Sequence, residues 1–378
     1  HYNKNTLKNK NINYFSLSFS IALKNRINNE QLNLLTFFES YPYINKLERF
    51  RFNNNTPYSI VNLYNADFKN GTLRIKTPGI YKLQENIVFN PNESNDFSPT
   101  SSQISSGLYP ENMSGPYHLG FFAAITVEAD DVIIDLNGYE LKQGELHKLQ
   151  QRFYANIELA NSPFIPRQGP GSFIQVGGYR PANKVLVMNG HLGSTSHHGI
   201  HANTANNVVL HDITIDNFEV AGIALNGTTN AVFNNITIQN NDKQIPVLST
   251  YSQARFICKF LNAAKVHTPD LKLTDTKTIS NIITNIENDL NTTFTQFRNN
   301  GTIPNNYFKN TNNEYDGNVY GIVLNVNGVV INDFIRQRTN EMIENQNIYL
   351  NNIIINNLSS IPVEIIGLNA SPISNTAY

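Results

Sequence analysis

The chain has 378 residues, of which 40% are hydrophobic and 15% charged, and its formal net charge is −1. Such low charge with 18 Tyr and 22 Phe excludes intrinsic disorder, and the near-neutral balance argues against nucleic acid as a partner. A single cysteine, Cys258, leaves no internal disulfide, and no stretch of about 18 apolar residues predicts a membrane span.

The first 65 residues are interpreted as an N-terminal arm onto a neighbouring chain, a cap over one end of the fold, or a small separate domain, with a helix expected over 29–40. The next segment, 66–241, opens with three short alternating stretches between 71 and 89, which predict three strands. A Ser-, Pro- and Asn-rich surface loop is expected over 91–117. A departure from the strands is expected over 141–182, with helical structure at about 144–160.

The most informative feature is a repeat that begins at Asn183, Asn206 and Asn230. Val185, Val208 and Val232 recur at 23 and 24 residues, and Leu192, Ile215 and Ile238 recur at 23 and 23. Short strands with Asn, Asp or Gly at the corners, repeating about every 23 residues, predict one turn of a parallel β-helix. Strands about 4.8 Å apart would stack the three Asn side chains in an amide ladder. Compositional bias accounts for most of the 61 asparagines.

The segment 242–315 has a different period and is interpreted as a helical insertion. Apolar residues at three-and-four spacing predict an amphipathic helix over 275–298, and a second helix is expected at about 250–266. We expect this insertion to pack on the flank of the β structure; a partner-binding helical hairpin is the alternative. From 316 to 378 the strand repeat resumes, because 321–325 repeats 222–226 and 347–355 repeats 230–238.

Residues 77–91, 129–139 and 183–241 resemble right-handed parallel β-helix proteins. This superfamily includes pectate-lyase-like and polygalacturonase-like carbohydrate enzymes and phage and viral tailspikes. The Asn-rich composition and the excursion at 141–166 are similar to uncharacterised β-helix proteins of large DNA viruses. The resemblance covers 71–241 and 317–370 and implies a mainly β, right-handed solenoid with α-helical insertions; it implies little about activity, because one fold hosts many functions.

Five of the nine histidines lie between 191 and 211. With Leu192, Ile213 and Ile215 pointing inward, strand alternation places His191 and Thr214 outward at equivalent positions, flanked by two aspartates. We therefore expect His191 to lie diagonally between Asp212 and Asp216 as a catalytic group, because a nearby carboxylate orients an imidazole and raises its pKa. The alternative interpretation is that these residues form an ordinary solvent-exposed face without a catalytic role. Predicted substrate-binding residues are Tyr139, the counterpart of His191, together with Thr214, His198 and His201.

His198 has a second interpretation, an inward orientation, because its counterpart in the next repeat is Ala221. The histidines at 197–201 could also bind a transition metal, but no Glu three to five residues away completes a zinc motif. The prediction is therefore no metal and no cofactor.

Two hypotheses for function remain. The first is a carbohydrate-recognising protein that binds a glycan or polysaccharide and, if it is an enzyme, acts as a lyase or glycoside hydrolase. The second is a non-enzymatic structural protein of a virion or surface assembly, as a homo-oligomer or with other virion proteins. The absence of Arg between 181 and 254 favours the second, because pectate lyases abstract a proton with a basic residue. The local His, Asp and Tyr residues favour the first, which is our leading hypothesis, with a virion or extracellular surface as the expected location.

Overall fold

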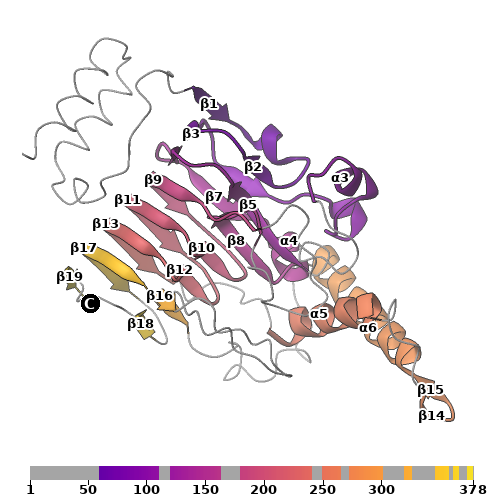
Figure 1. Cartoon of the computed structure of the whole chain (residues 1–378). Coiled ribbons are helices and arrows are strands. Elements are labelled where there is room, and N and C mark those ends of the chain that lie inside the picture. The colour runs from indigo at the N-terminus through magenta and orange to yellow at the C-terminus, as the bar shows by residue number, and fades with distance from the viewer. Residues whose placement is uncertain are drawn as a thin grey trace, which may run out of the picture.

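The structure is a computed structural model that describes residues 59–109, 120–162, 179–240, 249–264, 272–300, 319–325, 345–356, 361–365 and 373–377. Within these ranges the protein is mainly β, with one ten-stranded and one seven-stranded sheet, both parallel, and a small antiparallel pair (Figure 1). The predicted helix at 29–40, and most of the predicted arm or cap, lie outside the described residues. No helix in the described part of the chain has the length and apolar character to cross a membrane.

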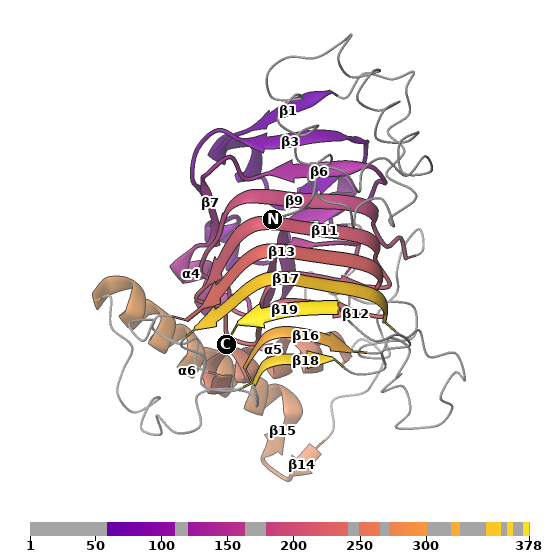
Figure 2. The ribbon, with the colours of Figure 1, turned by 90° about the vertical axis from the view of Figure 1, so that its left-hand side faces the viewer.

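The first sheet stacks its strands in chain order, as Figure 2 shows from β1 to β17. Its strands are β1 (Ile60–Leu63), β3 (Gly79–Leu83), β6 (Val132–Asp135), β9 (Asn183–Leu192), β11 (Asn206–Asp216), β13 (Thr229–Gln239), β17 (Gln346–Asn356) and β19 (Ile373–Ala377), with β4 (Ile87–Phe89) and β7 (Glu140–Gln143) joined beside β9.

The strands of the second sheet are also stacked in parallel. Its strands, in spatial order, are β18 (Ile361–Ile365), β16 (Tyr320–Asn325), β12 (Ala221–Asn226), β10 (His198–Asn203), β8 (Phe153–Glu158), β5 (Phe121–Val127) and β2 (Leu73–Ile75). The antiparallel pair is β14 (Lys272–Thr274) and β15 (Lys277–Thr278).

The chain alternates between the two sheets, so each long strand of the first sheet is followed by a strand of the second. Inward-facing apolar residues of both sheets form one continuous core, which includes Val187, Leu210 and Phe233 from the first sheet and Ile200 and Ile223 from the second. The predicted equivalence of Leu192, Ile215 and Ile238 is confirmed by the strand register. So is the continuation of the repeat, because β12 pairs with β16 and β13 with β17.

One predicted equivalence is wrong by a residue. Val208 pairs with Ala231, whereas Val232 pairs with Val209. Val209 and Val232 belong to a separate apolar cluster on the other side of the first sheet. Because side chains alternate between the faces of a strand, a shift of one residue moves a side chain out of the core.

The amide ladder exists, but Asn207 takes the place predicted for Asn206. Asn207 Nδ2 donates to Asn183 Oδ1 at 2.8 Å, Asn230 to Asn207 at 3.0 Å, and Asn347 to Asn230 at 2.8 Å. Asn207 and Asn230 have φ of 53° and 58°, in the left-handed region that Asn tolerates better than most residues. This turn changes the alternation, so the side chain of Asn207, and not that of Asn206, joins the ladder.

Residues 144–160 contain less helix than expected. Helix α4 covers Glu145–Gln150 only, and 153–158 forms strand β8, paired with β5 and β10. Tyr154 and Ile157 lie in the core. Pairing with a strand on each side therefore decides for a strand. The loop predicted over 91–117 also contains structure, namely the 3-10 turn η4 (Glu93–Asn95) and helix α3 (Ser101–Ser105), and 3-10 turn η3 (Asn65–Phe68) precedes β2.

The two helices expected between 242 and 315 are present as α5 (Ser249–Ala264) and α6 (Ile279–Asn300). They pack on each other through a cluster that includes Leu290, with Ile286 and Phe294 beside it. Helix α5 also contacts the β structure, because the Phe256 ring lies 5.0 Å from that of Phe153 and Arg255 Nε donates to the Gln150 carbonyl at 3.1 Å. The division of the chain into domains stays a prediction.

Candidate functional site

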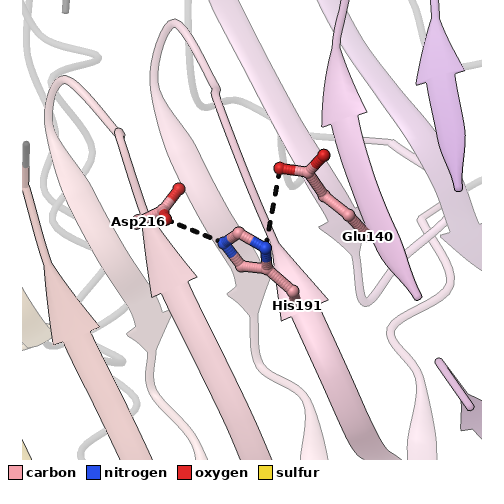
Figure 3. A group of neighbouring side chains, drawn as sticks. All are labelled: Glu140, His191 and Asp216. Atoms are coloured by element: carbon pink, nitrogen blue, oxygen red, sulfur yellow. Dashed lines mark ion pairs between the residues drawn. The ribbon is translucent and has the colours of Figure 1, made fainter. Parts of the chain in front are cut away.

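His191 lies between two carboxylates on the outward side of the first sheet (Figure 3). Its Nε2 atom is 2.9 Å from Asp216 Oδ2, and its Nδ1 atom is 3.5 Å from Glu140 Oε1. The three side chains come from neighbouring strands, Glu140 from β7, His191 from β9 and Asp216 from β11. They are 21%, 31% and 16% exposed for Glu140, His191 and Asp216, so the group is partly buried but open to solvent.

Strand register explains how these residues meet. His191 pairs with Thr214, as the sequence predicted, and with Glu140 on its other side. Asp216 follows Thr214 by two residues and so points to the same side of β11. The diagonal from Asp216 to His191 was predicted, and the contact at 2.9 Å confirms it.

Glu140, not Tyr139, is the counterpart of His191, so that prediction is wrong by one residue. Asp135 pairs with Met188 and Glu140 with His191. Four residues therefore lie between Asp135 of β6 and Glu140 of β7. Only two residues lie between their partners in β9, Met188 and His191. These two extra residues form the turn that divides β6 from β7, and Tyr139 at its end packs against the main core.

Asp212, predicted to flank His191 on the diagonal opposite Asp216, carries its carboxylate to His211 instead. Its Oδ2 atom lies 2.8 Å from His211 Nε2, and its Oδ1 accepts from Asn235 Nδ2 at 2.8 Å. Asp212 has φ of 51°, in the left-handed region. A residue in that conformation breaks the alternation of the strand, so the Asp212 carboxylate reaches the preceding residue, His211.

His191 is the titratable centre of the group. Hydrogen bonding to Asp216 raises its pKa; burial opposes this, and the charges of Asp216 and Glu140 add to the increase. The positive charge of Lys142, whose Nζ atom pairs with Glu140 Oε2 at 2.7 Å, lowers the pKa of His191 and so works against the increase. A half-buried imidazole with a raised pKa and a carboxylate at each nitrogen can give or accept a proton near neutral pH.

The same three residues also carry atoms that can bind a metal ion. One ligand atom of each lies within 4.8 Å of the others, which is close to what a metal ion needs. However, Glu140 faces one nitrogen of the His191 ring and Asp216 faces the other. A metal ion binds only one nitrogen of an imidazole ring, so it would lie beside only one of the two carboxylates. Lys142 also holds the second oxygen of Glu140 with its own positive charge. This arrangement fits proton transfer better than coordination.

His198 and His201, predicted beside His191, lie on strand β10 of the second sheet. Residues 193–197 carry the chain from one sheet to the other, which separates the two groups. The rings of His198 and His201 are stacked with centroids 4.9 Å apart, and His197 meets His198 at 4.1 Å. His201 Nδ1 lies 2.7 Å from Glu158 Oε2, and burial raises the pKa of Glu158.

The inward alternative for His198 is not what the structure shows. Its register partners are Ala155 and Ala221, and Ala221 belongs to a small apolar cluster apart from the main core. Burial, and then the neighbouring His197 and His201, lower the pKa of His198 well below its usual value. Its predicted role in binding substrate stays a prediction.

Gly193 makes room for Glu140. A Cβ atom at this position would overlap Glu140 Oε1 and lie 3.2 Å from Lys142 Cβ. Gly193→Ala should therefore move the Glu140 carboxylate from His191 and cost on the order of 1 kcal/mol in unfolding free energy. An NMR titration of the His191 ring should give a lower pKa in this variant and a larger decrease in Asp216→Asn.

Asp212→Asn is the matched control, because Asp212 faces His211 instead. An unchanged His191 pKa in Gly193→Ala, or an equal decrease in Asp212→Asn, would contradict the assignment of Glu140 as a partner.

Comparison of the chain with protein-family models, with curated proteins and with solved structures finds no match. The function must therefore be argued from the site itself.

Proposed function

We propose that the protein is a carbohydrate-recognising member of the right-handed parallel β-helix proteins, related to the pectate-lyase-like superfamily. The two parallel sheets that stack in chain order, with partners 23 residues apart, support this fold. In this proposal the polysaccharide lies on the outward side of the first sheet, across β7, β9, β11 and β13. Its expected location is a virion or another extracellular surface.

The observation that carries the proposal is the His191 group itself. A histidine between two carboxylates is an acid–base group, and its partial exposure lets a ligand reach it. Next to it the outward positions of β11 and β13 are Thr214 and Thr237, paired in register, followed by Asp216 and Gln239. Hydroxyl and amide side chains beside a carboxylate supply the donors and acceptors that sugar hydroxyls need.

The distance between Glu140 and Asp216 bears on the chemistry. Their nearest oxygens lie within 4.8 Å, with the His191 ring between them. Inverting glycosidases separate their carboxyl groups by about 6.5–9.5 Å to admit a water molecule. The pair is too close for that role. Retaining glycosidases separate theirs by only about 5–5.5 Å, but here the His191 ring lies between the two carboxylates, so His191 is the group that would move a proton in any cleavage of the bound polymer.

A glycan-array screen of the purified chain tests this proposal. His191→Asn and Asp216→Asn should abolish or weaken binding on the order of tenfold or more, because each removes a charged hydrogen-bonding group from the site. Asp212→Asn, the matched control, should bind as the unchanged protein does. If both site variants fold, as shown by an unchanged melting temperature, and still bind the glycan, the carbohydrate site must lie elsewhere. If the protein binds no glycan on the array, the result would favour the alternative hypothesis of a structural virion protein.

A further inference from the structure

A stripe of apolar side chains crosses the outward side of the first sheet. Seven neighbouring strands of this sheet, from β1 to β17 (Figure 2), each contribute one residue, and each residue pairs in register with the next. Leu186, Val209 and Val232 face away from the main core, because the residues that follow them point into it. The members of this outer stripe are Ile60, Ile80, Ile133, Leu186, Val209, Val232 and Tyr349.

The outer stripe is covered although it faces away from the core. Its five middle members are between 0% and 5% exposed in the single chain, and Ile60 and Tyr349 at its ends are partly buried. Among the described residues, the apolar side chains packed together here are those of the stripe and that of Met188, which also belongs to the sheet. Side chains on one face of a sheet lie beside one another and cannot cover one another from above. The cover therefore comes from this chain, from outside the described residues.

The outer stripe is also narrow. Two residues further along the strands, Met188 pairs with Asp135 on one side and His211 on the other. Two residues before the stripe, Asn207 and Asn230 form part of the amide ladder. Polar positions on both sides leave room for the apolar side of one extended segment. They do not offer the area of about 800 Å² per partner that a stable interface with a second copy needs.

The N-terminal segment 1–58 fits this description. It leads directly into β1, where the outer stripe begins at Ile60. Within it the alternating stretch 15–23 has small residues at every second position, and its apolar residues are Phe15, Leu17, Phe19, Ile21 and Leu23. Alternation puts these five side chains on one side of an extended stretch about 26 Å long, at about 3.3 Å per residue. The outer stripe, at about 4.8 Å per strand, is about 29 Å long.

We infer that residues 1–58 fold back over the first sheet and place the apolar side of residues 15–23 on the outer stripe. Burial within a single chain rules out a neighbouring chain as the source of this cover. The best-covered members, Ile133, Leu186 and Val209, lie in the middle of the sheet, which a cap over one end would not reach. Leu186 and His191 lie in opposite halves of β9, so the inference does not depend on the proposed carbohydrate function.

Light-induced cross-linking of the full chain tests the inference. With p-benzoylphenylalanine in place of Phe19, we expect a cross-linked monomer whose second peptide contains Ile133, Leu186 or Val209. The same group in place of Ser18, on the other side of the alternation, is the matched control and should give no such product. A product that joins two chains would overturn the inference, as would the absence of an outer-stripe peptide from the Phe19 position, or equal products from both positions.

Oxidation of Met188 provides a second measurement. Met188 is buried beside the outer stripe, and hydrogen peroxide converts a methionine thioether to its sulfoxide faster when the side chain is exposed. Phe19→Asp should speed this conversion on the order of tenfold, as followed by mass spectrometry, because a carboxylate is costly to hold on an apolar surface. Ser18→Asp should leave the rate unchanged. If both variants keep the β circular dichroism spectrum of the unchanged chain, equal oxidation rates in the two would overturn the inference.

Discussion

Glu128→Ala should cost about 3–5 kcal/mol of unfolding free energy, because it removes the carboxylate that pairs with the buried Arg74 guanidinium. The two side chains are each 8% exposed, and Arg74 Nε lies 2.5 Å from Glu128 Oε1. Arg74 also donates to the carbonyls of Leu108 and Asn161 at 2.8 and 3.2 Å. The pair therefore fixes β2 to two segments that lie far from it in the chain.

Replacing both partners separates the cost of an unpaired charge from the value of the pair. In Arg74→Met with Glu128→Leu no charge is left buried, so the double variant should recover most of the loss. Urea unfolding of the single and double variants measures this coupling. A double variant as unstable as the sum of its two single variants would show that the residues act independently.

An exposed ion pair provides the control. Arg298 of α6 pairs with Glu93, and their side chains are 51% and 35% exposed. Because water screens such a pair, Glu93→Gln should change the unfolding free energy by about 1 kcal/mol or less. A loss there as large as that in Glu128→Ala would mean that burial does not decide the cost.

The strand repeat could be predicted from the sequence because it follows from one physical requirement. Leu192, Ile215 and Ile238 must all enter the same core, and side chains of stacked parallel strands lie above one another. The same reasoning placed His191 beside Thr214 and Asp216 correctly. Repetition in sequence here corresponds directly to neighbours in space.

The errors occur where the backbone leaves regular strand geometry. Asn207 and Asp212 adopt left-handed conformations, and alternation no longer predicts where their side chains point. Glu140 was missed because the turn between β6 and β7 has two more residues than its counterpart in β9. The preference of Asn and Asp for positive φ is a signal that could have found the first two positions. The number of residues in the turn between two strands could not be predicted without knowing the strand register.

Acid should destabilise the protein through His147, by about 1.4 kcal/mol per pH unit below its unfolded pKa. Burial lowers the pKa of this ring from 6.5 to about 3, and the charge of Lys259 adds to the decrease. The ring is fully buried among Phe89, Phe97 and Tyr154, with centroids 5.1, 5.7 and 5.7 Å away. Gln143 Nε2 lies 2.8 Å from His147 Nδ1, a position from which it donates to the neutral ring.

Acid favours the unfolded chain because only that chain readily binds a proton at His147. Between pH 6.5 and about 3 the unfolded chain carries a proton on His147 and the folded chain does not, so stability falls as the pH is lowered through this window. The total loss from this one residue approaches about 5 kcal/mol. His197 and His198, whose pKa values burial also lowers, add losses of the same sign.

His147→Phe removes the titration while keeping a ring in the aromatic pocket. At pH 7 it should cost about 1 kcal/mol, because the hydrogen bond from Gln143 is lost. As the pH falls from 6.5 to 4.5, the variant should lose roughly 2–3 kcal/mol less than the unchanged protein, so the two stability curves cross. Urea unfolding at a series of pH values measures both curves.

His191→Asn is the control of opposite sign. The pKa of His191 is raised in the folded chain, so its contribution to stability is present at low pH and is lost as the pH rises through that pKa. This variant should therefore give no relief from acid. Parallel curves for His147→Phe and the unchanged protein would show that His147 is already protonated in the folded state. The aromatic pocket would then have to accommodate an imidazolium, stabilised by electrostatic contact with the faces of its three rings.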